Sequence, residues 1–236
     1  MADGQGGNLI YDIPAAVKGR TAIDPETYQQ MYDRSVQDPE GFWAEQAEQQ
    51  IDWFQKWDTV LQWDFDKADI KWFLNGKLNV SYNCLDRHVN AGAGDQTALI
   101  WQGNNEDESK KISYAAMLDQ VCQFANALKA LGVKKGDRVC LYMQMIPELP
   151  VAMLACTRIG AVHSIVFGAF SADSLRDRIQ DSECKVLITQ DTGLRGTKND
   201  IPMKANADAA VADCPSIRKV VVVQRTGHEV AMRNGQ

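Results

Sequence analysis

The residues best suited to chemistry lie in a glycine-rich segment, residues 190–198, which reads QDTGLRGTK. Arg195 and Lys198 place two cations three residues apart, and the two glycines allow a ligand to approach the backbone closely. A guanidinium can bind phosphate as a planar fork, and an ammonium binds it as a compact point charge. The spacing alone leaves two interpretations open, a phosphate-binding loop and an ordinary surface loop.

Other candidate groups are better explained by structure than by catalysis. His163 lies in the middle of an apolar run, so we interpret it as an interior histidine with satisfied hydrogen bonds, not as a base. Arg176 and Arg178 alternate with aspartates over residues 173–181, a pattern typical of a solvated helix face. The sequence contains no dinucleotide-binding, P-loop or nucleophile-elbow motif, and its three histidines are far apart. It therefore predicts no catalytic residue and no metal ligand.

Strand-length runs rich in β-forming residues surround the glycine-rich segment. They are residues 139–143, 162–166, 186–190 and 219–224. Helix-length segments separate the first three runs, and this alternation predicts an α/β fold with a mostly parallel sheet and right-handed crossovers. Because ligands bind beyond the carboxyl ends of such strands, we expect the loops 167–171 and 190–202 to reach one crevice.

The earlier part of the chain predicts a helical and hairpin arm in front of this sheet. Two helices are expected to begin with the same Asp-Pro-Glu sequence, at Asp24 and at Asp38. Aspartate caps a helix N-terminus, and proline suits the first helical position. An Asn-Gly pair at 75–76 lies between apolar runs at 70–74 and 78–82, which predicts a β-hairpin.

The composition excludes several classes of protein. Hydrophobic residues make up 45% of the chain and charged residues 24%, which are ordinary values for a globular protein. The formal net charge of -6 argues against a nucleic-acid-binding surface. No apolar run reaches the roughly 18 residues that span a bilayer. The six cysteines form no C-x-x-C pair and the N-terminus lacks the features of a secretory signal, so we expect a reduced, cytoplasmic protein.

Several segments carry a combined pattern that is more specific than any one of them. They are residues 72–79, 83–88, 124–126, 132–139, 145–148 and 161–168. Together they resemble the N-terminal part of AMP-forming acetyl-CoA synthetases, which belong to the adenylate-forming acyl-CoA synthetase family. The likeness extends from about Tyr28 to Gln224 and covers nearly the whole chain.

The resemblance implies the activity of an acetate–CoA ligase. Such an enzyme uses ATP and Mg²⁺ to convert acetate into acetyl-adenylate with release of pyrophosphate. The thiol of coenzyme A then displaces AMP and forms acetyl-CoA. The implied partners are therefore small molecules, namely acetate, ATP and coenzyme A, with neither a nucleic acid nor a membrane among them.

In that family, a Phe-Gly-Gly loop and a later arginine-containing loop hold the nucleotide end of coenzyme A. The matching positions are Phe167, Gly168, Ala169, Arg195, Lys198 and Pro202. The chain departs from the family pattern at Ala169, which replaces a glycine, and at Lys198, which stands where a second arginine is common. The lysine keeps the charge but loses the bidentate fork. One extra residue also separates Lys198 from Ile201.

The family's phosphate loop, acyl pocket, Mg²⁺-binding acids and C-terminal domain follow later in its sequence. The resemblance therefore implies an N-terminal fragment that is inactive alone. We expect an irregular segment at 1–23, an acetyl-CoA-synthetase-type N-terminal segment at 24–88, and a truncated first part of the AMP-binding domain at 89–236. Two alternatives stay open. One is a propionyl-CoA synthetase fragment, and the other is a non-catalytic module that binds coenzyme A or a nucleotide, or pairs with a complementary chain.

Overall fold

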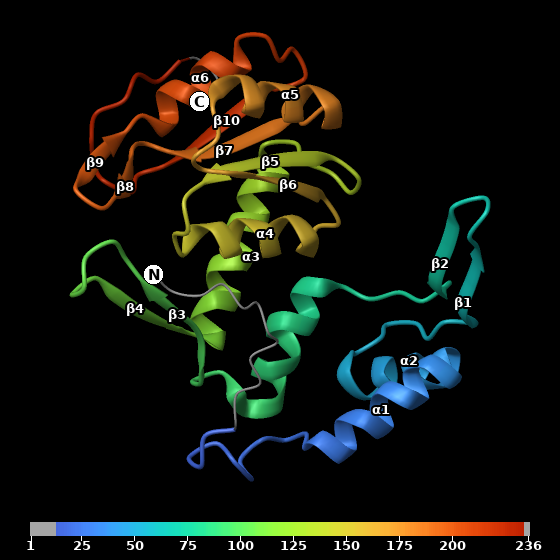
Figure 1. Cartoon of the computed structure of the whole chain (residues 1–236). Coiled ribbons are helices and arrows are strands. Elements are labelled where there is room, and N and C mark those ends of the chain that lie inside the picture. The colour runs from blue at the N-terminus through green and yellow to red at the C-terminus, as the bar shows by residue number, and fades with distance from the viewer. Residues whose placement is uncertain (1–12, 234–236) are drawn as a thin grey trace, which may run out of the picture. The chain divides into compact units, whose positions relative to one another are not determined.

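The computed structural model describes residues 13–233 and is drawn in Figure 1. Contacts between residues divide the chain into two units. The smaller unit contains the residues up to Ile51 together with Lys56–Gly76. The larger unit contains Asp52–Gln55 and the chain from Lys77 onward, and the candidate site lies entirely within it.

Two capped helices open the described part of the smaller unit. Helix α1 spans Pro25–Gln37 and helix α2 spans Pro39–Gln50. The carboxylate of Asp24 accepts a hydrogen bond of 2.7 Å from the backbone N–H three residues further on. Asp38 accepts the equivalent bond at 3.0 Å. Both predicted N-caps are confirmed, and each satisfies a backbone donor that the helix itself leaves without a partner.

The β-hairpin of the smaller unit differs from the predicted one. Strand β1 (Thr59–Asp64) and strand β2 (Asp69–Leu74) form an antiparallel pair. The prediction that residues 70–74 pair with residues 78–82 is therefore wrong, because β2 pairs with the strand that precedes it.

Local side-chain chemistry explains why the chain after β2 does not return as a strand. Asn75 adopts the left-handed backbone, with φ of 63°, that favoured a turn. The side chain of Asn79, however, accepts a hydrogen bond of 3.2 Å from the backbone N–H of Tyr82. This bond favours helix over strand, and π-helical turns follow at Tyr82–Asp86 and Val89–Ala93.

Four parallel strands form the central sheet of the larger unit, in the order β10-β7-β5-β6 (Figure 1). Their bounds are Arg138–Met143 for β5, Val162–Phe167 for β6, Val186–Gln190 for β7 and Lys219–Val223 for β10. Every strand pair in this sheet is parallel. The predicted α/β fold class and the four predicted strands are thus confirmed, with β5 and β7 in the centre of the sheet.

Helices cover both faces of this sheet (Figure 1). Their bounds are Tyr114–Ala130 for α3, Glu148–Arg158 for α4, Ala172–Ser182 for α5 and Met203–Val211 for α6. Successive side chains of β5 point to opposite faces. Val139 and Leu141 pack in one hydrophobic core with α3 and α4, whereas Cys140 and Tyr142 pack in the other with α5 and α6. The continuous apolar character of β5 follows from this burial on both faces.

A second antiparallel pair precedes α3 and supplies one side of the candidate site. It consists of β3 (Thr97–Gln102) and β4 (Ser109–Ser113). The hydroxyl oxygen of Ser113 accepts a hydrogen bond of 3.3 Å from the backbone N–H of Ala116, which caps α3.

Candidate ligand-binding site

A pocket of about 580 Å³ opens at the carboxyl ends of β5 and β6. The loop after each of these strands, the loop between β3 and β4, a segment beyond β7, and Arg225 line it. Five of the six candidate residues are among the lining residues: Phe167, Gly168, Ala169, Arg195 and Lys198. Pro202 is not among them, although the adjacent Ile201 is. The two loops that were expected to share one crevice therefore do so.

The segment that carries the two cations is a β-hairpin, not the loop that its glycines predicted. Strand β8 (Gly193–Arg195) pairs antiparallel with strand β9 (Lys198–Ile201). Gly196 and Thr197 form the turn between them, and Gly196 has a φ of 58°. This left-handed backbone is the one that two-residue hairpin turns require and that glycine adopts at low cost.

The hairpin brings the two cations face to face. Arg195 and Lys198 are directly opposite each other across β8 and β9. Opposed residues of an antiparallel pair present their side chains on the same face, and like charges in this position repel. Both residues are exposed. None of the ion pairs found among residues 13–233 includes either of them.

The loop after β6 contributes an aromatic side chain and a close backbone contact. Phe167 is 62% exposed, and its ring meets that of Phe170 edge to face with centroids 6.0 Å apart. A Cβ atom on Gly168 would lie 3.1 Å from the carbonyl oxygen of Met143. Glycine at this position therefore lets the loops after β5 and β6 pack together. The methyl group of Ala169 is exposed.

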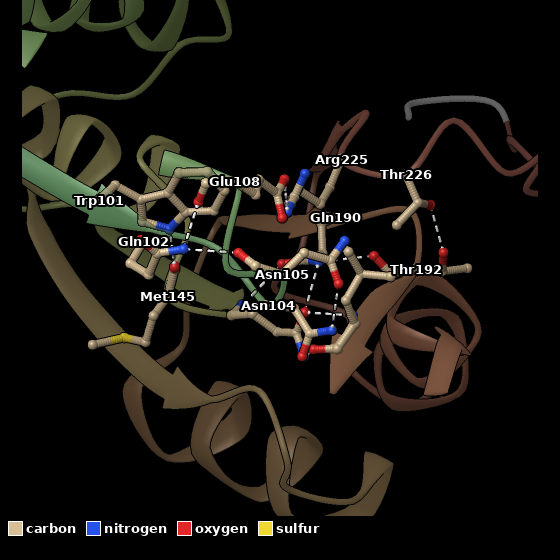
Figure 2. Close-up of polar contacts among 12 residues, drawn as sticks. Trp101, Gln102, Asn104, Asn105, Glu108, Met145, Gln190, Thr192, Arg225 and Thr226 are labelled. Carbon is tan, nitrogen blue, oxygen red and sulfur yellow. Dashed lines mark hydrogen bonds and ion pairs between the residues drawn. The ribbon is translucent and has the colours of Figure 1, made fainter. Parts of the chain in front are cut away.

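A tryptophan and an arginine that no motif singled out also line the pocket, and a glutamate pairs with the arginine (Figure 2). The indole N–H of Trp101 donates a hydrogen bond of 2.7 Å to the carbonyl oxygen of Met145. The guanidinium of Arg225 lies 5.1 Å from the centroid of the Trp101 ring and pairs with Glu108 at 2.6 Å. The sequence signals at these positions were only a polar loop before β4 and a polar segment after β10, and neither predicts contact with the other.

A buried carboxylate fixes the segment that carries Arg225. Asp191 follows β7 and accepts hydrogen bonds from the backbone N–H groups of Arg225 (3.0 Å), Thr226 (3.0 Å) and Gly227 (2.8 Å). It also accepts one from Thr192 at 2.7 Å. Burial by itself would raise the pKa of the Asp191 carboxyl, but these four donors hold that pKa below its ordinary value. The cluster anchors the chain after β10 at the carboxyl end of β7.

The remaining candidate groups lie elsewhere. His163 is half-buried on the edge strand β6, and its buried Nδ1 atom has no hydrogen-bond partner among the described residues. The interpretation of a satisfied histidine is therefore wrong, and burial lowers the pKa of its imidazole. Arg176 pairs with Asp173 and Asp177 on α5, as expected for a solvated face. Within residues 13–233, no group of three or more His, Cys, Asp or Glu side chains is arranged to hold a metal ion.

Comparison with known proteins assigns this chain to a family. Residues 85–234 match the family model of AMP-binding enzymes. The chain belongs to the AMP-binding enzyme family. Residues 28–84 match a second model, described as acetyl-coenzyme A synthetase N-terminus. The resemblance to the N-terminal portion of acetyl-CoA synthetases is thus confirmed. As a separate finding, no helix in residues 13–233 is long and apolar enough to cross a bilayer.

Several curated proteins similar to this chain are described as acetyl-coenzyme A synthetases. An acetyl-coenzyme A synthetase of Halorhodospira halophila is 54% identical over 227 residues, which cover 96% of this chain and 35% of that protein. An acetyl-coenzyme A synthetase of Magnetococcus marinus is 56% identical over 227 residues, with the same coverage. Acetyl-coenzyme A synthetase 2 of Pseudomonas putida is 53% identical over 226 residues, again 96% and 35%. The chain therefore spans about a third of the length of these relatives.

Proposed function

We propose that the pocket binds the phosphorylated adenosine end of coenzyme A, and that the chain contributes this site to an acetate–CoA ligase. The observation that carries the proposal is the pair of opposed cations, Arg195 and Lys198, at the pocket. Their repulsion weakens the hairpin unless an anion lies between them. The 3′-phosphate and the diphosphate of coenzyme A are such anions, and charge-assisted hydrogen bonds to phosphate are strong.

The candidate residues have different roles in binding the nucleotide. The exposed ring of Phe167 offers a face for adenine, and Arg195 offers a fork for phosphate. Gly168 keeps the two loops in contact, while Ala169 adds a methyl group at the rim of the pocket. Pro202 follows β9 and acts by ending the hairpin.

The chemistry of adenylation belongs, in our proposal, to segments beyond this chain. The relatives are acetyl-CoA synthetases, and the chain spans 35% of their length. The resemblance assigns the groups that bind ATP, Mg²⁺ and the acyl group to later segments. The chain alone should therefore form no acetyl-adenylate. A propionyl-CoA synthetase is the alternative that fits the same residues. The two enzymes differ in the acyl pocket, which the resemblance assigns to later segments.

We also propose two further properties of the chain. The first is the division of the chain at residue 88 into an N-terminal segment and the first part of an AMP-binding domain. The second is a cytoplasmic location, which the six free cysteines support because four of them are buried and serve as small apolar side chains.

Calorimetric titration tests the proposed site. The 236-residue chain, and the same chain continued with the missing portion of a curated relative, are each titrated with coenzyme A and with 3′-dephospho-coenzyme A. We expect coenzyme A to bind more tightly than the dephosphorylated form, and binding of both to weaken as salt is added. If neither protein binds coenzyme A, the proposed site is wrong.

A second candidate function is a non-catalytic module that pairs with a complementary chain. Strand β6 is an edge of the sheet, and its side chains Val162 and Ile165 are 53% and 45% exposed. Exposed apolar edge strands are ready to pair with another chain. Co-expression with the remaining portion of a relative as a separate chain distinguishes the two candidates. A module would form a complex without acetate-dependent ATP–pyrophosphate exchange, whereas a ligase portion would restore that exchange.

A further inference from the structure

Two side-chain amides, from segments far from the hairpin in sequence, bind the backbone of β8 and of the turn that follows it. The first is Asn104, in the loop between β3 and β4. Its Oδ1 atom accepts a hydrogen bond of 2.8 Å from the backbone N–H of Gly196. Its Nδ2 atom donates one of 2.9 Å to the carbonyl oxygen of the same residue. One amide thus pairs with both polar groups of one backbone residue, as a neighbouring strand would.

The second amide repeats this arrangement two residues earlier. Gln144 follows β5, and its Oε1 atom accepts a hydrogen bond of 2.9 Å from the backbone N–H of Leu194. Its Nε2 atom donates one of 3.1 Å to the carbonyl oxygen of Leu194. A Cβ atom on Gly193 would lie 2.7 Å from Gln144 Oε1, so glycine at this position makes room for the amide. Gln190 Oε1 in turn accepts a bond of 2.8 Å from the backbone N–H of Gln144.

One amide binds Leu194 in β8, and the other binds Gly196 in the turn after it. Residues of a strand alternate in the direction of their backbone polar groups. Arg195 pairs across to β9, while Leu194 and Gly196, the residues on either side of it, bind the amides. Arg195 is therefore paired with β9 and has an amide-bound residue on each side of it along the chain. A two-stranded hairpin is marginal by itself, and this one must also bear the repulsion between Arg195 and Lys198.

We propose that Asn104 and Gln144 are positioning residues, which hold β8 so that Arg195 and Lys198 present a preformed binding site to a phosphate group. This inference rests on the proposed function, because it assigns the amides a purpose only if the cations bind an anion. Neither amide needs to touch the ligand. Each acts by keeping the hairpin in its bound conformation, which spares the ligand the cost of ordering it.

Hydrogen exchange of backbone amides tests the geometry without any ligand. In the 236-residue chain, Asn104→Ala should speed the exchange of the Gly196 amide by about three- to tenfold, the range expected for one lost hydrogen bond. Gln144→Ala should do the same for the Leu194 amide. Asp107→Ala is the control in the same loop, where this side chain is exposed, and it should change neither rate. Unchanged exchange in both variants would overturn the proposal.

Titration with adenosine 3′,5′-bisphosphate, the nucleotide end of coenzyme A, tests whether the two amides support ligand binding. Asn104→Ala and Gln144→Ala should each weaken binding about three- to tenfold, for the same loss of hydrogen bonding. In an Arg195→Ala, Lys198→Ala background, the same changes should have no further effect, because the amides act through the cations. A loss that persists undiminished in that background would overturn the positioning role.

The two proposals fail in different ways. A wild-type chain that does not bind the bisphosphate, even when continued with the missing portion of a relative, contradicts the proposed function. Faster exchange at Gly196 and Leu194 would then show a structural clamp, without the role in ligand binding. Conversely, tight binding of the bisphosphate with unchanged affinity in both amide variants upholds the proposed function and overturns only the positioning role.

Discussion

Glu108 and Arg225 form an ion pair of 2.6 Å although they are 117 residues apart in the sequence. Arg225 lines the pocket beside Trp101, and Glu108 neutralises its charge. Arg195 and Lys198, in contrast, face the same pocket without a carboxylate partner among the described residues. The unsatisfied positive charge of the pocket is therefore concentrated at the hairpin.

Arg195→Ala should weaken the binding of coenzyme A by about ten- to a hundredfold, because a hydrogen bond to a charged group is worth about 1.5–3 kcal/mol. The measurement is the apparent affinity for coenzyme A in the chain continued with the missing portion of a relative. The rate of acetyl-adenylate formation is measured separately and should not change. Arg176→Ala, on the solvated face of α5, is the control. An equal loss in adenylate formation would mean that Arg195 supports the fold or the ATP site instead.

Lys198→Arg should strengthen the binding of coenzyme A by about two- to fivefold, since a guanidinium adds a bidentate fork where the ammonium offers only a point charge. Lys198→Gln should weaken it, and both effects should shrink at high salt. Isothermal titration at two salt concentrations makes the comparison. If Lys198→Gln binds as tightly as the wild type, the lysine takes no part in the site.

The purified 236-residue chain should give no acetate-dependent exchange between ATP and pyrophosphate. Exchange requires groups that hold the triphosphate and Mg²⁺ at the reacting carboxylate, and the resemblance assigns these to segments beyond this chain. An intact relative serves as the positive control under the same conditions. Exchange above background would show that this chain itself contains the adenylation site.

Asp191→Asn should destabilise the fold by about 1–3 kcal/mol at pH 7, the cost of leaving buried hydrogen-bond donors without a charged acceptor. The pKa of the folded Asp191 carboxyl lies below its ordinary value of 3.8. The ionised Asp191 carboxylate therefore stabilises the fold above pH 3.8, and this stabilisation is lost as the pH falls through the folded pKa. Urea denaturation at pH 7 and pH 3 measures the difference in free energy of unfolding between the wild type and Asp191→Asn. This difference should be smaller at pH 3. A difference that stays constant, or an equal effect of Asp95→Asn at an exposed site, would contradict this account.

Local sequence determined the features whose energetics are local. Asp24 and Asp38 cap helices because a carboxylate reaches a backbone donor only three residues away. The apolar runs around Leu141 and Ile188 became parallel strands because they are buried on both faces of the sheet. Because these strands are parallel, the loop at Phe167 and the segment at Arg195 leave the same edge of the sheet, and both line one pocket.

Contacts with residues distant in the sequence decided which segments pair as β-strands. The Asn-Gly pair after β2 predicted a hairpin with the residues that follow, but β2 pairs with β1, and the side chain of Asn79 favours helix instead. The glycines of 190–198 predicted a loop, yet a β-hairpin forms there, and two amides bind the backbone of β8 and of its turn. Competing local conformations of similar free energy are separated by a few hydrogen bonds to distant groups, which periodicity and spacing do not encode.

The sequence by itself therefore determined the fold class, the family and the two segments that meet at the pocket. Only the tertiary structure decided that Arg195 and Lys198 oppose each other, that Asn104 and Gln144 hold them there, and that Glu108 neutralises Arg225. The physical reason is the range of the interactions. Caps and apolar patterns act over a few residues, whereas these contacts join side chains that lie close together only after the sheet has formed.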